Sequence, residues 1–304
     1  MTRPKSFLTL GDIVVEDWPY MWKRAAELKK ARLQDTLAGK AVALVFEKAS
    51  TRTRVSFEVG VYELGGHAVV LTSQGSQIAR GEPIEDTARV LSGYCSMIVI
   101  RTFGQDRVAQ LARWATVPVV NGLSDQHHPC QVATDLFTVM EKFGTIDGLK
   151  YAWIGDGNNM ANSWIEAAGL FGLDLAIACP EGYAPDSLLI QAARANQQRR
   201  GRGSLTLTSD PQVAVAGAHV INTDVWASMG QEDEVARRRA VFRDFCVDAG
   251  LVHRAAPEAV VLHCLPAHRG EEITGDVLDG PRSLAWVQAE NRLHMGKAIL
   301  EAVR

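Results

Sequence analysis

The chain lacks both a long hydrophobic run and an excess of one charge. No apolar stretch approaches the roughly 18–20 residues of a transmembrane helix, and the first residues form a short mixed segment rather than the apolar core of a signal peptide. The 32 basic and 35 acidic side chains give a net charge of −3, which argues against the basic surface of a dedicated nucleic-acid binder. We therefore expect a cytoplasmic protein that binds neither membranes nor nucleic acids.

Cysteine is scarce as well. The 304 residues include five cysteines, an odd number, and none of them belongs to a Cys-x-x-Cys pair. This pattern argues against a disulfide framework and against a zinc ribbon. Free cysteines are mostly small, buried apolar residues, so we expect at least three of the five to serve only in packing.

The chain has no internal repeat and no low-complexity tract, and it alternates short apolar runs with amphipathic stretches. The runs are rich in Val, Ile and Ala and mostly lack polar alternation, which is typical of parallel strands covered on both faces. We predict strands at residues 41–46, 97–100, 117–120, 151–154, 173–179, 219–221 and 260–262. Helical spacing predicts helices at residues 53–64, 84–92, 129–142, 160–171 and 288–304.

Strands that alternate with helices indicate βαβ units and hence an α/β fold. Gly144, Asp147 and Gly148 interrupt the pattern, with three predicted strands before them and four after. The length suits two ordinary domains. We predict two doubly wound domains, each with a mostly parallel sheet flanked by helices. The first comprises residues 1–143 together with the C-terminal helix 288–304, and the second comprises residues 144–287.

The first candidate site is a cluster of hydroxyls and arginines between a predicted strand and the next helix. Ser50, Thr51 and Thr53 offer hydroxyl donors, and Arg52 and Arg54 offer forked guanidinium groups. A helix N-terminus adds unpaired N–H groups and partial positive charge, and guanidinium groups match phosphate oxygens. These features favour a phosphate site. The alternative is a helix N-cap with two solvated arginines.

Two further strands of the first half end at polar side chains. Arg101 directly follows the run 97–100, and His128 and Gln131 follow the run 117–120 through a glycine-containing loop. Ligands of open α/β sheets bind at the carboxyl ends of strands. A basic pocket with a histidine and a glutamine suits an acyl phosphate, because cations hold the phosphate while donors polarise the carbonyl.

The second half opens with Gly155-Asp-Gly157, which looks like the start of a dinucleotide-binding loop. Met160 stands where the third glycine of that fingerprint would fall, so a nicotinamide dehydrogenase is disfavoured and we expect no cofactor. The alternative is a tight strand–helix turn that presents the Asn159 amide to a ligand.

Asp224 and Cys264 follow the last two predicted strands. An aspartate at a strand end can receive an ammonium group. Cys264 leaves three alternatives open: a nucleophile, a zinc ligand with His263 and His268, or a packing residue. The ligand spacing is poor for zinc, so we expect no metal. His263 is adjacent in the strand, which normally directs it to the opposite face.

Two charged segments are predicted to lie on the protein surface. Residues 197–203 (QQRRGRG) predict a solvated basic turn, with a phosphate or nucleic-acid role as the less favoured alternative. In residues 232–239, the spacing of Glu234 and Arg238 predicts an exposed i,i+4 ion pair on a helix.

Several of these segments together resemble the aspartate and ornithine carbamoyltransferase family. Residues 50–54 (STRTR) are similar to the family's carbamoyl-phosphate motif, and residues 128–131 (HPCQ) to its His-Pro-x-Gln motif. The resemblance extends nearly from end to end. Residues 224–230 (DVWASMG) and 263–266 (HCLP) resemble the ornithine-specific members rather than those specific for putrescine, acetylornithine or aspartate.

The resemblance implies an enzyme that transfers the carbamoyl group of carbamoyl phosphate to the δ-amine of L-ornithine, giving L-citrulline and phosphate. The first domain would bind carbamoyl phosphate and the second ornithine. The family is built on a homotrimer whose sites are shared between subunits. We expect a role in arginine biosynthesis rather than in arginine catabolism.

The resemblance also implies roles for individual residues. Arg101 would bridge the phosphate and the carbonyl oxygen, His128 would donate to that oxygen, and Gln131 would hold the carbamoyl amide. The implied carbamoyl-phosphate ligands are Ser50, Thr51, Arg52, Thr53, Arg101, His128, Gln131, Cys264, Leu265 and Arg292, with Gln77 reaching a neighbouring subunit's site. The implied catalytic residues are Arg101, His128, Cys264 and Arg292. The implied ornithine ligands are Asn159, Asp224, Ser228 and Met229, with Asp224 on the α-ammonium and Cys264 orienting the attacking amine.

Overall fold

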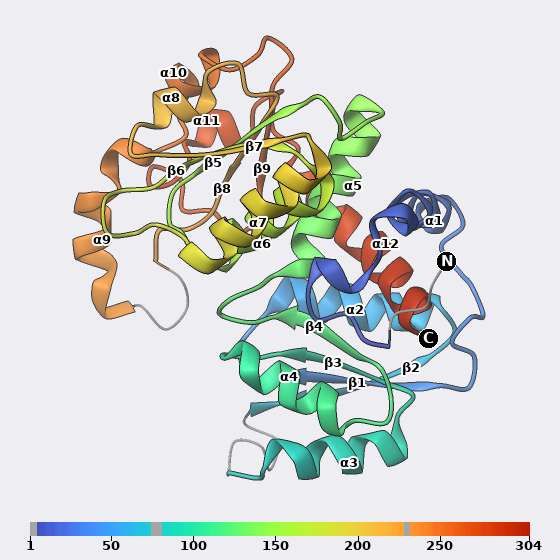
Figure 1. The fold of residues 1–304 in the computed structure, drawn as a ribbon. Helices are drawn as coiled ribbons and strands as arrows, with labels where there is room; N and C mark the ends of the chain where they lie inside the picture. The colour runs from blue at the N-terminus through green and yellow to red at the C-terminus, as the bar shows by residue number, and fades with distance from the viewer. Residues whose placement is uncertain (1–4, 74–80, 228–231) are drawn as a thin grey trace. The chain divides into compact units, whose positions relative to one another are not determined.

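The computed structural model describes residues 5–73, 81–227 and 232–304. The chain folds into two compact units, each built around its own parallel sheet (Figure 1). Unit 1 comprises Met1–Phe137 and Glu290–Arg304, and unit 2 comprises Thr138–Ala289. The division falls inside two long helices, α5 (Pro129–Phe143) and α12 (Ala285–Val303), so each helix contributes residues to both units.

The sheet of unit 1 consists of β1 (Ala41–Phe46), β2 (His67–Thr72), β3 (Met97–Arg101) and β4 (Val119–Leu123). The strands are parallel and lie in the order β2-β1-β3-β4. The central strands β1 and β3 are almost fully buried, as expected for strands covered on both faces. The edge strand β2 is only half buried.

Helices cover both faces of this sheet (Figure 1). The helices of unit 1, besides α5 and α12, are α1 (Trp18–Lys30), α2 (Thr51–Glu63), α3 (Ile84–Tyr94) and α4 (Gln105–Trp114), preceded by 3₁₀ turns at Leu10–Asp12 and Val15–Asp17. α3 and α4 pack their apolar sides against β1 and β3, and α2 and α12 lie on the opposite face. Gly60 allows α2 and α12 to approach closely, because a Cβ at this position would lie 3.3 Å from the Lys297 side chain.

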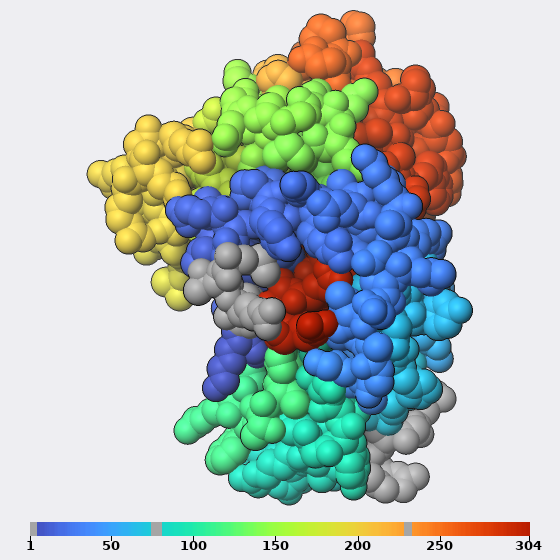
Figure 2. Space-filling model, turned by 90° about the vertical axis from the view of Figure 1, so that its right-hand side faces the viewer, coloured from blue at the N-terminus to red at the C-terminus, as the bar shows by residue number. Residues whose placement is uncertain are grey.

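The C-terminal part of α12 is enclosed by N-terminal segments, and Figure 2 shows its end in red among blue segments. Lys297 is fully buried, and its Nζ donates to Glu63 Oε2 at 2.6 Å and to the Leu28 carbonyl at 3.0 Å. A buried ammonium is stable only when it is paired and hydrogen-bonded. This contact therefore fixes the position of α12 along α1 and α2.

The sheet of unit 2 consists of β5 (Lys150–Ile154), β6 (Asp174–Ala178), β7 (Ser204–Thr208), β8 (Val220–Thr223) and β9 (Val260–His263). These parallel strands lie in the order β7-β6-β5-β8-β9. The strand order reverses direction at β5, between β6 and β8. Such a switch point is where ligands of doubly wound sheets bind.

The helices of unit 2 also form two layers (Figure 1). They are α6 (Asn159–Phe171), α7 (Ser187–Arg200), α8 (Pro211–Val215), α9 (Val235–Val241), α10 (Ala249–His253) and α11 (Gly275–Leu278), with 3₁₀ turns at Glu232–Glu234 and Arg243–Phe245. α6 and α7 pack together on one face, and α8, α10 and α11 share an apolar core on the other.

The predicted α/β fold with two parallel sheets is confirmed, but the predicted strand counts of three and four are wrong. The sheets have four and five strands because β2 and β7 were missed. Both are short edge strands with partly exposed residues, and periodicity does not separate such short runs from other segments. Among the described residues, no helix is both long enough and apolar enough to span a membrane.

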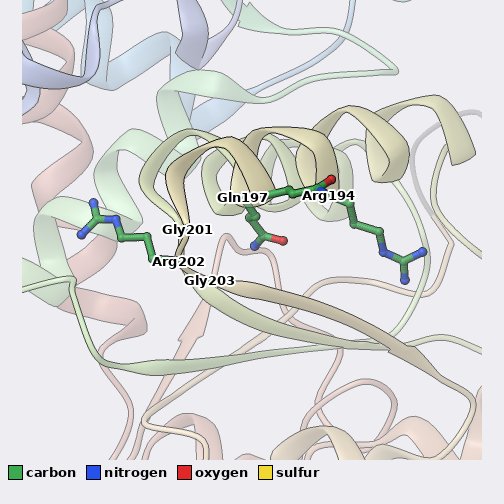
Figure 3. A pocket seen from close by; sticks show the side chains of 6 residues that line it. Arg194, Gln197, Gly201, Arg202 and Gly203 are labelled. Atoms are coloured by element: carbon green, nitrogen blue, oxygen red, sulfur yellow. The ribbon is translucent and has the colours of Figure 1, made fainter.

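The predicted basic turn at residues 197–203 is wrong for its first part, because α7 continues to Arg200. Gln197 is buried, and its Nε2 donates to the Leu173 carbonyl at 2.9 Å. Figure 3 shows the hollow at this helix end, with the side chains of Arg194 and Arg202 extending in opposite directions. Arg202 pairs with Asp147 at 3.1 Å. These cations therefore do not converge on one ligand position.

Candidate active site

The first cluster lies in unit 1, at the edge where the carboxyl ends of its parallel strands meet. β1 and β3 end in register, with Phe46 beside Arg101, and Arg101 in turn lies beside Leu123 of β4. α2 begins shortly after β1, and α5 begins after the loop that follows β4. The predicted site residues that follow β1, β3 and β4 therefore lie at one edge of the sheet, which is the usual ligand position in this architecture.

Ser50 is the N-cap of α2, and its Oγ accepts a hydrogen bond from the Thr53 backbone N–H at 3.2 Å. The N-cap alternative is therefore correct for Ser50, and the positive end of the capped helix still favours an anion. Arg54 is exposed, and its Nε faces Glu58 at 3.4 Å. Arg54 therefore matches the solvated-arginine alternative rather than the phosphate interpretation.

Thr53 joins two of the predicted arginines. Its hydroxyl is fully buried and accepts hydrogen bonds from Arg101 at 3.3 Å and from Arg292 at 2.6 Å. A hydroxyl that accepts twice still has its own hydrogen to donate. Arg101 comes from β3 and Arg292 from α12, and the structure thus brings Thr53 into contact with an arginine that is 239 positions away in the sequence.

Gln131 is held at both ends of its side-chain amide. Its Oε1 accepts from Arg292 Nη1 at 2.9 Å, and its Nε2 donates to Asp135 Oδ1 at 2.8 Å. Gln131 and Asp135 are fully buried, and Arg292 is 7% exposed. Sequence reasoning missed Asp135, although a Gln and an Asp four residues apart on a helix are known to hydrogen-bond.

His128 is buried among cations. Burial is the main cause that lowers the pKa of its imidazole well below the usual value, and the charges of Arg292, Arg101 and Arg52 lower it further. The ring is therefore neutral at pH 7, with one N–H donor and one acceptor nitrogen. A neutral imidazole among arginines can donate to a carbonyl oxygen without carrying a charge of its own.

Cys130 lies two residues after His128 in the sequence and is buried in α5. Its Sγ donates to the Asn121 carbonyl at 3.3 Å, and burial raises the pKa of the thiol to about 12. Cys95 and Cys179 are also buried and free. The expectation that at least three cysteines are packing residues is confirmed.

The second cluster lies in unit 2 and centres on Asp224, which directly follows β8. Its Oδ2 accepts from Asn158 Nδ2 at 3.0 Å, and its Oδ1 accepts from the Val225 N–H at 2.8 Å and from Cys264 Sγ at 3.0 Å. Sequence reasoning missed Asn158, whose Oδ1 also caps α6 by accepting from the Met160 N–H at 2.9 Å. The predicted Asn159 is the first residue of α6 and only half buried.

His263 does not serve Cys264 as a base. Its Nε2 contacts Glu272 at 2.9 Å, and its Nδ1 accepts from the Leu265 N–H at 2.8 Å. His268, the second histidine of the zinc alternative, lies with Glu271 and Glu272. Cys264 instead donates to Asp224, which suits a role in orienting this carboxylate.

Leu265 has a backbone conformation that is rare for its type. Its φ is +58°, in the left-handed region that disfavours residues with a Cβ, and it precedes a cis bond to Pro266. Strained residues cluster at ligand sites. The conformation at Leu265 therefore supports the prediction that this segment is functional.

The loop after β5 is a tight turn. A Cβ at Gly157 would lie 2.6 Å from the Tyr183 carbonyl, so this glycine allows two backbone segments to approach. Next to it, buried Asp156 pairs with Arg238 at 2.9 Å, and Arg238 also donates to the Trp226 carbonyl at 2.8 Å. The predicted pair of Arg238 with Glu234 forms at 2.8 Å, but Arg238 is buried, so the expectation of an exposed pair is wrong.

Three predicted ligands lie outside the described residues. They are Gln77, Ser228 and Met229.

Comparison with known proteins supports the resemblance over nearly the whole chain. A family model described as the carbamoyl-P binding domain of aspartate/ornithine carbamoyltransferase matches residues 5–141. A second model, described as the Asp/Orn binding domain of the same family, matches residues 147–303.

Individual relatives agree with these matches. The chain is 54% identical over 303 residues to the ornithine carbamoyltransferase of Geobacter sulfurreducens, covering 98% of this chain and 99% of the relative. Its fold is similar to ornithine carbamoyltransferase from Pyrococcus furiosus, with a TM-score of 0.95, 48% identity, and coverage of 100% and 98% of the two chains. It is also similar to the anabolic ornithine carbamoyltransferase of Campylobacter jejuni, with a TM-score of 0.92, 37% identity, and coverage of 97% of each chain. The chain therefore belongs to the aspartate/ornithine carbamoyltransferase family, and it is a carbamoyltransferase enzyme.

Proposed function

We propose that the protein transfers the carbamoyl group of carbamoyl phosphate to the δ-amine of L-ornithine, giving L-citrulline and phosphate. One observation carries the donor assignment: Arg101 and Arg292 meet at the buried Thr53 hydroxyl, beside a neutral His128. Cations suit the phosphate, and a neutral donor suits the carbonyl oxygen. The ornithine assignment is supported by the relatives of 37–54% identity, which are named ornithine carbamoyltransferases.

In this reaction the nitrogen lone pair of the δ-amine attacks the carbonyl carbon. The new C–N bond forms, the bond from carbon to the bridging oxygen breaks, and phosphate leaves with that electron pair and takes up the proton that the amine loses. Arg52, Arg101 and Arg292 stabilise the leaving phosphate, together with Ser50, Thr51 and Thr53. His128 donates to the oxygen on which negative charge develops, which is an oxyanion-type contribution.

Gln131 binds the amide end of the donor, and the unit 2 residues bind the acceptor. Asp224 pairs with the α-ammonium of ornithine, because neutral donors position its carboxylate. Asn159, Ser228 and Met229 complete the acceptor site, and Leu265 belongs to the donor site. Cys264 donates to Asp224 and orients the reacting amine rather than forming a covalent intermediate.

We further propose that residues 1–143 with helix 288–304 form the donor domain, that residues 144–287 form the acceptor domain, and that the enzyme serves arginine biosynthesis in the cytoplasm. The Campylobacter jejuni relative, described as anabolic, supports the biosynthetic role. Five free cysteines are typical of a reducing compartment.

We also propose a homotrimer in which Gln77 reaches a neighbouring subunit's site. The half-buried edge strand β2 and the exposed Val55 and Tyr62 of α2 offer an apolar face for a second copy.

A citrulline assay tests the proposed function. The purified protein is incubated with carbamoyl phosphate and with ornithine, putrescine, acetylornithine or aspartate in parallel, and carbamoylated products are measured. We expect turnover with ornithine in clear preference to the other three acceptors. Equal turnover with putrescine, or none with ornithine, would contradict the assignment.

A further inference from the structure

We propose that Asp135 is a specificity-determining positioning residue: it fixes the Gln131 amide so that the donor site favours a carbamoyl NH₂ over a methyl group at the same place. The proposal rests on the proposed function, since it requires the unit 1 cluster to bind carbamoyl phosphate. Asp135 itself acts through Gln131.

The partners of Gln131 determine which way its amide faces. The two ends of a glutamine amide have nearly the same shape, and their hydrogen-bond partners assign them. The Arg292 guanidinium only donates, so the atom that faces it at 2.9 Å is the oxygen. The Asp135 carboxylate accepts, so the atom that faces it at 2.8 Å is the nitrogen. Both contacts are buried, which makes the reversed orientation costly.

This orientation has a consequence for the donor. A carbonyl oxygen has two lone pairs, and the contact with Arg292 uses only one of them. The second can accept an N–H from the carbamoyl NH₂, whereas a methyl group offers no polar hydrogen. In the reversed orientation the glutamine NH₂ would face the carbamoyl NH₂, and two donors would oppose each other. Asp135, together with Arg292, therefore sets the orientation in which the site recognises the amide.

Helix stability does not explain why an aspartate occupies position 135 of α5. Aspartate is a poor helix former, and a buried carboxylate is costly unless its partners compensate. The neighbouring Thr134 makes an ordinary contact in the same helix, because its hydroxyl donates to the Cys130 carbonyl at 2.7 Å. Thr134 thus provides a matched control that touches the helix but not the Gln131 side chain.

Two stable analogues of the donor test this proposal. Phosphonoacetamide carries an NH₂ where acetonylphosphonate carries a methyl group, and they are otherwise matched. Calorimetry on the full-length protein gives the dissociation constant of each. We expect the wild-type protein to prefer the amide on the order of 10–100-fold, because a site built to bond an N–H rejects the analogue without it.

The variants locate the origin of this preference. In Asp135→Leu the ratio of the two dissociation constants should fall toward one, because only the contact with Arg292 then holds the Gln131 amide. Asp135→Asn should keep most of the ratio, since its Oδ1 still accepts from Gln131, and Thr134→Val should keep all of it. A purely structural role would weaken both analogues equally and leave the ratio unchanged in Asp135→Leu, which would overturn the proposal.

The wild-type measurement alone is also decisive. If the intact protein binds the two analogues equally, the proposal is wrong whether or not Asp135→Leu folds. If neither analogue binds, the proposed carbamoyl-phosphate site itself is wrong, and the two failures are thereby distinguished.

Discussion

The candidate sites of the two units carry opposite charges, but in both of them neutral hydrogen-bond partners hold the charged side chains in place. In unit 1, Arg101 and Arg292 donate to the neutral hydroxyl of Thr53. In unit 2, the Asp224 carboxylate accepts from the neutral amide of Asn158 and from the Val225 N–H. A neutral partner holds a charged side chain in place without cancelling its charge. Each unit thus keeps the charge that its proposed ligand needs, cationic for a phosphate and anionic for an ammonium.

The units differ in the number of charges that they gather. Unit 1 places Arg52, Arg101 and Arg292 close enough to His128 to lower its pKa, whereas unit 2 centres on one carboxylate. A phosphate carries more than one negative charge and can accept from several donors, while an ammonium needs one counter-charge. Mutations at the unit 1 site should therefore mainly impair the use of carbamoyl phosphate, and mutations at the unit 2 site should mainly impair the binding of ornithine.

The largest effect is expected for Arg292→Ala. This change removes donors to Thr53 and Gln131 and one cation from the proposed phosphate site, so kcat/KM for carbamoyl phosphate should fall on the order of 10²–10³-fold. Initial rates at saturating ornithine give this value. Arg54→Ala is the matched control: Arg54 is exposed and faces Glu58, so it should behave like the parent enzyme. Comparable losses in both variants would contradict the phosphate assignment.

Asp224→Ala should raise the KM for ornithine by roughly 10–100-fold, because a hydrogen bond between charged groups is lost. The KM for carbamoyl phosphate should stay near its original value, since Asp224 belongs to unit 2. Asn158→Ala, which removes only a partner of Asp224, should show a smaller rise. Equal losses for both substrates would count against the division of labour between the units.

Acidification should destabilise unit 1 through two buried histidines. Burial lowers the pKa of His128 well below its usual value and that of His294 to about 4. As the pH falls below about 6.5, the unfolded chain takes up protons that the folded chain does not, so the free energy of unfolding decreases by up to about 1.4 kcal/mol per pH unit for each histidine. Denaturant unfolding at several pH values measures this slope.

The variants His128→Gln and His294→Gln should each reduce this slope. Above pH 7 the two histidines should add little pH dependence to the free energy of unfolding. A slope that stays the same in both variants would show that other groups cause the acid sensitivity.

The smallest effect is expected for Cys264→Ser. The serine hydroxyl can still donate to Asp224 Oδ1, so activity should remain within about tenfold of the parent enzyme. A loss of activity of more than about 10³-fold would restore the covalent alternative. So would a carbamoylated cysteine detected by mass spectrometry.

The sequence predicted the layout well where apolar runs end at polar residues. Arg101 and Asp224 each follow a buried strand, and His128 opens a helix after another, so a parallel sheet must place each at a carboxyl edge. The edge strand β7 was missed because its polar residues alternate with apolar ones, as in many exposed segments. The burial of Arg238 was also missed, because the i,i+4 spacing with Glu234 says nothing about Asp156, which lies 82 positions away.

By itself the sequence determined the fold class and the kinds of group at each strand end, because local periodicity and the order of polar residues along the chain are enough for both. Only the tertiary structure decided which groups meet. The contact between Arg292 and Thr53 depends on how α12 packs against α2, with Lys297 held by Glu63. The Gln131 orientation depends in turn on Arg292 and Asp135. Such pairings arise from long-range packing of helices, which leaves little trace in the local sequence.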